Sequence, residues 1–431
     1  MAAMLIAVWV LLAGGCGGGG GDSTVPDDAS LTDEDFANVS AFVADSPYSD
    51  VIVDCASVTS SADSCTLERL PLIGMETQSP DIDQIMDRVV VSHQWMGERF
   101  HEALEMLPGD LLLLLRNVTA VVIDDDIRPS YFTTRSGAIY LDPAKLWLTN
   151  EEKATINQKD DYRSDFDNLL AFRSLWRYVK AGSRAYSSYS LDSDKVRSLN
   201  DILLPLAALL YHELAHANDF FPLAQVELLD TSISVSEASA QVVDYRISTL
   251  LDQREPLTSS VMFGLAEVMY KGQTPSEEQM EITAAVVGEA FEADGASDDY
   301  GYTTVFEDVA MLFEEAMMKY HFDVDREMAF TTVVGDETRC ADHLIGWGNH
   351  GRIGDTDVKS RAQFVASEIL PGEDFSLFFQ NLAYPAEMVE GNTWCGILDP
   401  AATTGARKAF GANLEIRADQ SVGAEEMLRH H

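Results

Sequence analysis

The sequence predicts an α+β fold that is mostly helical, with a small sheet beside one long central helix. Many segments place their apolar residues at the three- and four-residue spacing of helices that bury one face. Two short segments, 118–123 and 137–141, are instead rich in β-branched or aromatic residues and are bounded by Asp, Pro or Gly. The central helix is indicated by the apolar run that leads into residues 211–219.

The remaining elements follow from the same spacing. We expect further helices at 81–107, 165–180, 237–251, 259–270, 277–291, 304–320, 361–370 and 375–383. A Ser- and Tyr-rich loop is expected at 182–194. The strand at 137–141 precedes the central helix. It can run beside the site and offer its edge to an extended peptide, or it can lie inside the sheet.

The central helix carries His212-Glu213-x-x-His216, the H-E-x-x-H pattern. Residues four apart share a helix face, so both imidazoles can bind one zinc ion. Glu213 projects beside that ion and can take a proton from a bound water. Asp219 follows on the next turn and can orient a ligand. Pro205 is expected in the first turn of this helix; two buried, structural histidines are the alternative.

Composition excludes some partners. The chain has 431 residues and a net charge of −42. Phosphates would be repelled, so nucleic acid is not an expected partner. Anionic lipid surfaces would be repelled for the same reason.

The first residues predict export. Residues 4–12 form an apolar run that ends in Leu-Ala-Gly-Gly-Cys, too short to span a membrane. The arrangement resembles a bacterial lipobox with Cys16 as the lipidated residue. A plain secretory peptide is the alternative. Gly17 after the cysteine favours the outer membrane, with the protein facing the periplasm or the exterior.

The other cysteines agree with an oxidising compartment. Four remain after Cys16, and four cysteines allow three pairings. Loop entropy favours the near pair Cys55–Cys65, which leaves Cys340–Cys395.

A second motif lies downstream, in Tyr300-Gly301-x-Thr303 and Glu307-x-x-Ala310. Thr304 and Glu307 also have the form of a helix capping box. Together with the first motif, this stretch resembles the gluzincin metallopeptidases, and within them the anthrax lethal factor-like group. That group carries H-E-x-x-H-A-x-D, then Tyr-Gly-x-Thr, and a Glu seven residues after the Tyr; here 307 − 300 = 7.

The resemblance implies a zincin-like metallopeptidase domain that binds Zn²⁺ through His212, His216 and Glu307. It also implies Glu213 as general base and Tyr300 as transition-state donor. The sequence departs from the group in a gap of 91 residues between His216 and Glu307 (307 − 216), which the helices of 237–291 would fill. Glu237 is the alternative third ligand. It lies 21 residues after His216 (237 − 216), a gap common among gluzincins.

These observations predict five regions: a signal peptide at 1–15, a lipidated flexible tether at 16–35, an N-terminal helical region at 36–117, a catalytic domain at 118–330 and a C-terminal subdomain at 331–431. The expected function is zinc-dependent hydrolysis of peptide bonds in a peptide or protein substrate at the bacterial cell envelope. The alternative is a lipoprotein of the envelope that binds metal and a protein partner without catalysis.

Overall fold

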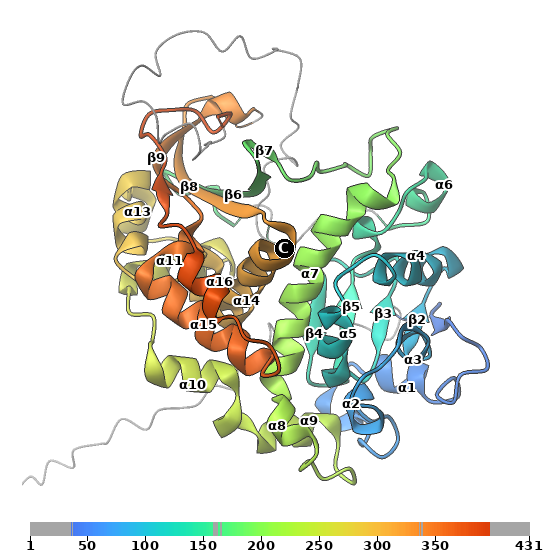
Figure 1. The fold of residues 1–431 in the computed structure, drawn as a ribbon. Helices are drawn as coiled ribbons and strands as arrows, with labels where there is room; N and C mark the ends of the chain where they lie inside the picture. The colour runs from blue at the N-terminus through green and yellow to red at the C-terminus, as the bar shows by residue number, and fades with distance from the viewer. Residues whose placement is uncertain are drawn as a thin grey trace, which may run out of the picture.

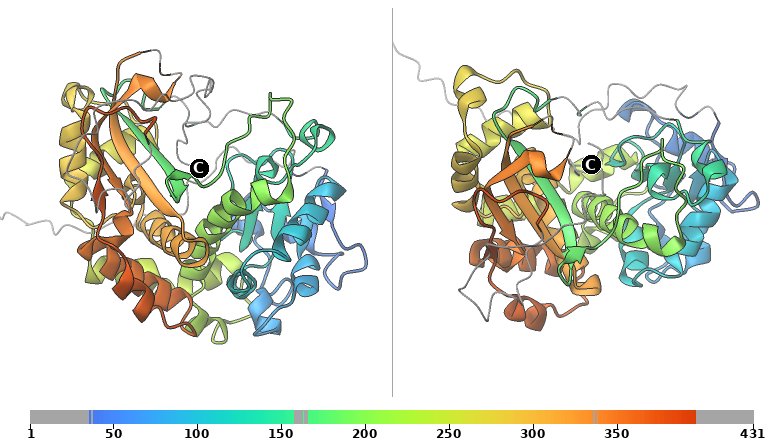
Figure 2. Two further views of the ribbon diagram at one scale, coloured as in Figure 1. Left: turned by 45° about the horizontal axis from the view of Figure 1, so that its top comes forward. Right: turned by 90° about the horizontal axis from the view of Figure 1, so that it is seen from above.

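Two five-stranded sheets and the helices packed around them make up the part of the chain that the structure describes (Figures 1 and 2). The structure is a computed structural model. It describes residues 36–396 except 37, 158–162, 164–165, 336 and 338. The predicted α+β class is confirmed. The predictions for residues 1–35, which include the signal peptide, the tether and lipidation of Cys16, lie outside the described residues.

The first sheet has three parallel strands flanked by two antiparallel ones. In spatial order it contains β1 (Ser40–Ala41), β2 (Val89–Val91), β3 (Val121–Ile123), β5 (Ala138–Leu141) and β4 (Tyr131–Thr133). Both faces are buried, as parallel strands require. Alternate residues therefore join different cores, with Val121 and Ile123 on the side of the central helix and Val122 on the other side.

The position of β5 decides between the two alternatives for residues 137–141. β5 pairs with β3 on one side and with β4 on the other, so it lies inside the sheet and offers no free edge. The strand at the edge beside the central helix is β4, which contacts that helix.

The second sheet was not expected from the sequence. Its antiparallel strands lie in the order β10 (Ala386–Glu387), β9 (His343–His350), β8 (Asp325–Val333), β6 (Arg173–Lys180) and β7 (Ser183–Arg184). The predicted helix at 165–180 is therefore wrong, because its second half is β6. Arg173 to Val179 are all buried, so the strand shows no alternation of apolar and polar residues.

The helices pack around and between these sheets. They are α1 (Ile52–Ala56), α2 (Ile73–Glu76), α3 (Ile82–Met86), α4 (Gln94–Leu104), α5 (Asp110–Leu114), α6 (Asn150–Lys153), α7 (Leu199–Phe220), α8 (Leu223–Val226), α9 (Val235–Gln241), α10 (Ile247–Arg254), α11 (Ser260–Met269), α12 (Glu277–Glu281), α13 (Ala284–Glu292), α14 (Val305–Phe322), α15 (Thr356–Ile369) and α16 (Ser376–Asn381). One long helix at 81–107 is wrong, because β2 interrupts it between α3 and α4. The segments 237–251 and 277–291 are likewise divided into shorter helices.

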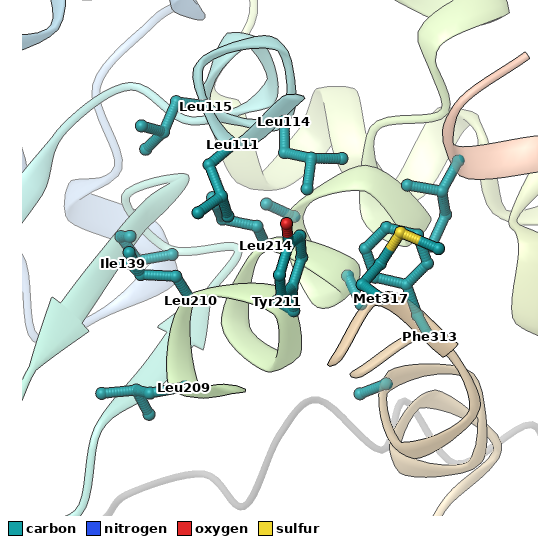
Figure 3. Close-up of a cluster of buried hydrophobic side chains, with 14 of the residues drawn as sticks. Leu111, Leu114, Leu115, Ile139, Leu209, Leu210, Tyr211, Leu214, Phe313 and Met317 are labelled. Carbon is teal, nitrogen blue, oxygen red and sulfur yellow. The ribbon is translucent and has the colours of Figure 1, made fainter. Parts of the chain in front are cut away.

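α7 and α14 lie side by side at the centre of the molecule (Figure 1). α7 contacts β4 and β5 of the first sheet, and α14 contacts β8 of the second. Between them Tyr211 meets Phe313 edge to face, while Leu210 and Ile139 belong to the same core (Figure 3). Pro205 lies inside α7 and not in its first turn, since the helix begins at Leu199.

Both predicted disulfides are present. Cys55–Cys65 and Cys340–Cys395 have Cα–Cα distances of 5.5 and 4.9 Å. Within the described residues, no helix is long and apolar enough to cross a membrane.

Two of the predicted region boundaries fall within the sheets. The boundary at 117/118 separates β2 from β3, which pair directly in one sheet, and the region before it also contributes β1. The boundary at 330/331 falls within β8. The regions therefore share sheets and are not separate units.

Candidate metal centre

Three side chains from α7 and α14 converge at the centre of the molecule. The Nε2 atoms of His212 and His216 lie 3.1 and 3.3 Å from Oε2 of Glu307. The donor atoms of this group all lie within 4.8 Å of one another, and the three residues are buried. This group can hold a metal ion.

Local structure explains the convergence. His212 and His216 lie one turn apart on α7, so their imidazoles leave the same face. Glu307 lies in the first turn of α14, where its backbone N–H donates to the Thr304 hydroxyl at 3.1 Å. Thr304 therefore caps the helix as predicted, but the Glu307 carboxylate points at the histidines. The cap and the ligand position are compatible because they use different atoms of Glu307.

Burial and close contact shift the pKa values of Glu307 and His212 in opposite directions. Burial raises the pKa of Glu307, but His216 and His212 lower it more, so its pKa lies well below its ordinary value. Burial lowers the pKa of His212, but hydrogen bonds to Glu307 and Glu314 raise it well above its ordinary value. Both shifts come from the close approach of the Glu307 carboxylate to the two imidazoles.

Glu213 and Tyr300 lie beside the ligands. Glu213 is buried, and its Oε2 has no hydrogen-bond partner in the described part of the chain. Burial raises the pKa of Glu213, while His212 and His216 lower it less. The ring of Tyr300, in the 3₁₀ turn Asp299–Tyr302, lies 6.3 Å from the His212 ring. A buried acceptor therefore adjoins the group, and a phenol lies beside the His212 ring.

The chain was also compared with known proteins. No family model, curated protein or solved structure matches it.

The donor set itself fits a divalent metal, because two imidazole nitrogens and one carboxylate oxygen leave one position of a tetrahedron for water or substrate. Nε2 of His216 faces Glu307, and Nδ1 of the same ring has no hydrogen-bond partner among the described residues.

Asp219 and the alternative ligand Glu237 accept hydrogen bonds from serine residues outside the group of His212, His216 and Glu307. Oδ1 of Asp219 accepts a hydrogen bond from the backbone N–H of Ser248 at 2.7 Å, which ties α7 to α10. Glu237 is exposed, and its carboxylate accepts from the N–H and hydroxyl of Ser234 as part of the cap of α9. Glu307, and not Glu237, lies beside the two histidines.

Glu314 was missed by the sequence analysis. Its Oε2 lies 3.2 Å from Nδ1 of His212, on the side of the ring opposite Glu307. A signal was present, since Glu314 follows Glu307 by seven residues (314 − 307), which is two helical turns on one face.

Other histidines lie away from the centre. In β9, His350 interacts with Asp325 and Glu327, and His343 lies 3.3 Å from the Thr331 hydroxyl. Burial lowers the pKa of His350, but the two carboxylates raise it to about 9. Within the described residues, only the group of His212, His216 and Glu307 has the geometry of a metal site.

Proposed function

We propose that this protein is a zinc-dependent peptidase of the gluzincin type, with a zincin-like catalytic fold around α7 and α14. One observation supports this most: a buried His–His–Glu group from two helices lies together with Glu213 and Tyr300. Glu213 was named as the base from the H-E-x-x-H pattern, and Tyr300 of the second motif was named from the resemblance alone. Their position beside the metal group supports the same assignment. The two sides of that group are distant in sequence, since His212 and Glu307 lie 95 residues apart.

Zinc is the metal we propose, because imidazole nitrogen and carboxylate oxygen suit it and the N₂O set leaves a fourth position open. When bound, zinc supplies Lewis acidity, which polarises the scissile carbonyl and activates a water.

The residues of the chain supply the proton transfers. Glu213 accepts the proton of the attacking water and returns it to the leaving amine. Its Oε2, which has no hydrogen-bond partner among the described residues, leaves an acceptor for that water. Tyr300 donates its hydroxyl hydrogen to the developing oxyanion. Arg163 lies 3.4 Å from the Tyr300 hydroxyl and can hold the phenol in place before substrate binds.

We also propose that the protein works outside the cytoplasm. The two disulfides fit an oxidising compartment. The apolar run before Cys16 supports export as a lipoprotein, and Gly17 after the cysteine favours anchoring to the outer membrane through Cys16.

Zinc content and Glu213→Gln test the proposal together. The protein purified and reconstituted with zinc should hold about one ion per chain. Glu213→Gln should keep that zinc and lose at least about 100-fold in cleavage of a broad peptide library, because general-base catalysis contributes this much or more. Zinc is measured by elemental analysis and cleavage by mass spectrometry.

Three outcomes are informative. Wild-type protein without zinc would contradict the metal centre. Full activity in Glu213→Gln would contradict the role of Glu213. Zinc binding without cleavage of any peptide in the library would favour the alternative, a metal-binding envelope protein that recognises a partner without catalysis.

A further inference from the structure

A buried chain of charged groups leads from the metal group into the second sheet. Glu314 on α14 is fully buried, and its Oε2 lies 3.2 Å from Nδ1 of His212. An ionised carboxylate offers only acceptors, so Nδ1 of His212 donates in this contact when Glu314 is charged. The other nitrogen of the ring, Nε2, then faces Glu307.

The second sheet holds the other oxygen of Glu314. Tyr178 on β6 donates its hydroxyl hydrogen to Oε1 at 2.9 Å, and Nη1 of Arg326 on β8 lies 3.5 Å from the same atom. Tyr178 and Arg326 are opposite one another in the β6–β8 pair, so a single position in the sheet supplies both groups. The guanidinium carbon of Arg326 lies 4.0 Å from the centre of the Trp176 ring, which fixes the arginine from a further side.

Arg326 has a second carboxylate partner. Its Nη2 lies 2.5 Å from Oδ2 of Asp298, and both residues are buried. The other oxygen of Asp298 accepts a hydrogen bond from the backbone N–H of Tyr300 at 2.9 Å. Arg326 therefore contacts both Glu314, whose carboxylate lies beside His212, and Asp298, whose carboxylate holds the Tyr300 turn.

We propose that Glu314 is a positioning residue for the metal ligand His212, and that Tyr178 and Arg326 of the second sheet fix Glu314 in that role. This inference rests on the proposed metal centre. It assigns a function to the second sheet, which contributes no ligand of its own in the described residues.

The physical reason is the orientation of the imidazole. A histidine that donates from Nδ1 to a carboxylate keeps Nε2 free of its proton when a metal binds there, and its ring cannot rotate away. The carboxylate also raises the basicity of the ligand nitrogen. Because Glu314 is buried, its charge requires compensation, which Arg326 and the Tyr178 hydroxyl provide.

The test compares two neighbouring variants, Glu314→Gln and Glu315→Gln. Glu315 is a matched control. It is buried on the same helix and accepts a hydrogen bond from the backbone N–H of Ile353 at 3.2 Å. Burial raises the pKa of Glu315 to about 8, so the change to an amide removes little charge at neutral pH.

Zinc affinity is measured by competition with a chromophoric chelator, using the full chain. Glu314→Gln should bind zinc about 10–100-fold more weakly than the wild type, the range for loss of a group that orients a ligand. Glu315→Gln should bind zinc like the wild type. The d–d absorption of the cobalt-substituted protein should change in Glu314→Gln and match the wild type in Glu315→Gln, because only the first substitution replaces the charged acceptor of the His212 ring.

The outcomes separate this inference from the proposed function. If wild-type protein binds zinc and Glu314→Gln binds it equally well, the positioning role is overturned while the metal centre stands. Equal losses in both variants would also overturn it, because they would indicate general disturbance of α14. If wild-type protein binds no zinc, the metal centre itself fails and the inference fails with it.

Tyr178→Phe provides a milder variant in case Glu314→Gln does not fold. It removes one hydroxyl that donates to Glu314 and keeps the ring in the core. Its zinc affinity should fall in the same direction but by less. An unchanged affinity in this variant would overturn the part assigned to the second sheet.

Discussion

At the scale of single residues, Glu307 combines two roles that its sequence position describes only in part. Its backbone N–H completes the Thr304 cap, and its carboxylate lies with His212 and His216 in the group that can hold a metal ion. Glu237 has the same capping arrangement, with Ser234 in the place of Thr304, but its carboxylate turns back to its own cap. The carboxylates of these two capping residues therefore make different contacts, because the fold places two imidazoles opposite Glu307 and not opposite Glu237.

Side-by-side zinc titration of Glu307→Ala and Glu237→Ala checks this difference. Glu307→Ala should weaken zinc binding by more than about 100-fold, since that is the upper end for a group outside the ligand set. Glu237→Ala should leave the affinity unchanged, because its carboxylate is exposed and caps α9. Normal zinc binding in Glu307→Ala together with loss in Glu237→Ala would contradict the ligand set.

The sequence predicts some residues of the site well and others not at all. His212, Glu213 and His216 follow from local geometry, because spacing of four on a helix fixes a common face. Glu307 needed a second motif, since the contact between α7 and α14 is tertiary. Glu314 was not found, because an acidic residue within a helix is ordinarily exposed and only the fold brings it to His212.

At the scale of elements, the prediction failed where apolar residues are continuous. Val89–Val91 looks like one turn of a helix in a longer apolar pattern, but it is a parallel strand buried on both faces. Residues 173–180 have apolar side chains at helical spacing, but the buried charges of Arg173 and Arg177 fit a strand whose two faces are covered. The strands at 121–123 and 138–141 were found because turn residues bound them.

Packing of α13 on β9 provides a test at this scale. A Cβ at Gly288 would lie 2.1 Å from both Cβ and Cγ of Trp347, so Gly288→Ala forces the helix and the strand apart. We expect a loss of about 1–3 kcal/mol in the free energy of unfolding, typical of overpacking. Chemical denaturation followed by circular dichroism measures it.

Gly264→Ala is the matched control, since Gly264 also lies within a helix, α11. The nearest atom to its added Cβ is the flexible Gln279 Nε2 at 3.3 Å. The gain in helix propensity, up to about 1 kcal/mol, should offset that contact. Equal stability of Gly288→Ala and the wild type would show that α13 and β9 are not in close contact.

At the scale of the whole molecule, the group of His212, His216 and Glu307 links the two sheets through α7 and α14. α7 lies against the first sheet and α14 contacts the second, and each helix supplies at least one ligand (Figure 1). A bound ion therefore connects parts of the chain that are distant in sequence. The second sheet, which the sequence did not predict, takes part through α14 and through the contacts of Tyr178 and Arg326 with Glu314.

Removal of metal should accordingly destabilise the whole fold. A ligand that binds only the folded state at about 100 times its dissociation constant adds about 2.7 kcal/mol. Differential scanning calorimetry should show a lower unfolding temperature after treatment with a chelator, restored by added zinc. The Glu307→Ala variant should show no response to the chelator. A response as large as that of the wild type would mean that the metal binds elsewhere.

The first sheet contains strands from both sides of residue 118, and this limits which segments of the chain can be exchanged by recombination. β1 and β2 come from the region before residue 118, and β2 lies parallel to β3 in a fixed register. An unrelated segment inserted in place of 36–117 would have to provide a strand with the same direction, register and apolar pattern on both faces. A fragment that ends at residue 117 would therefore carry β1 and β2 without β3, the parallel partner of β2.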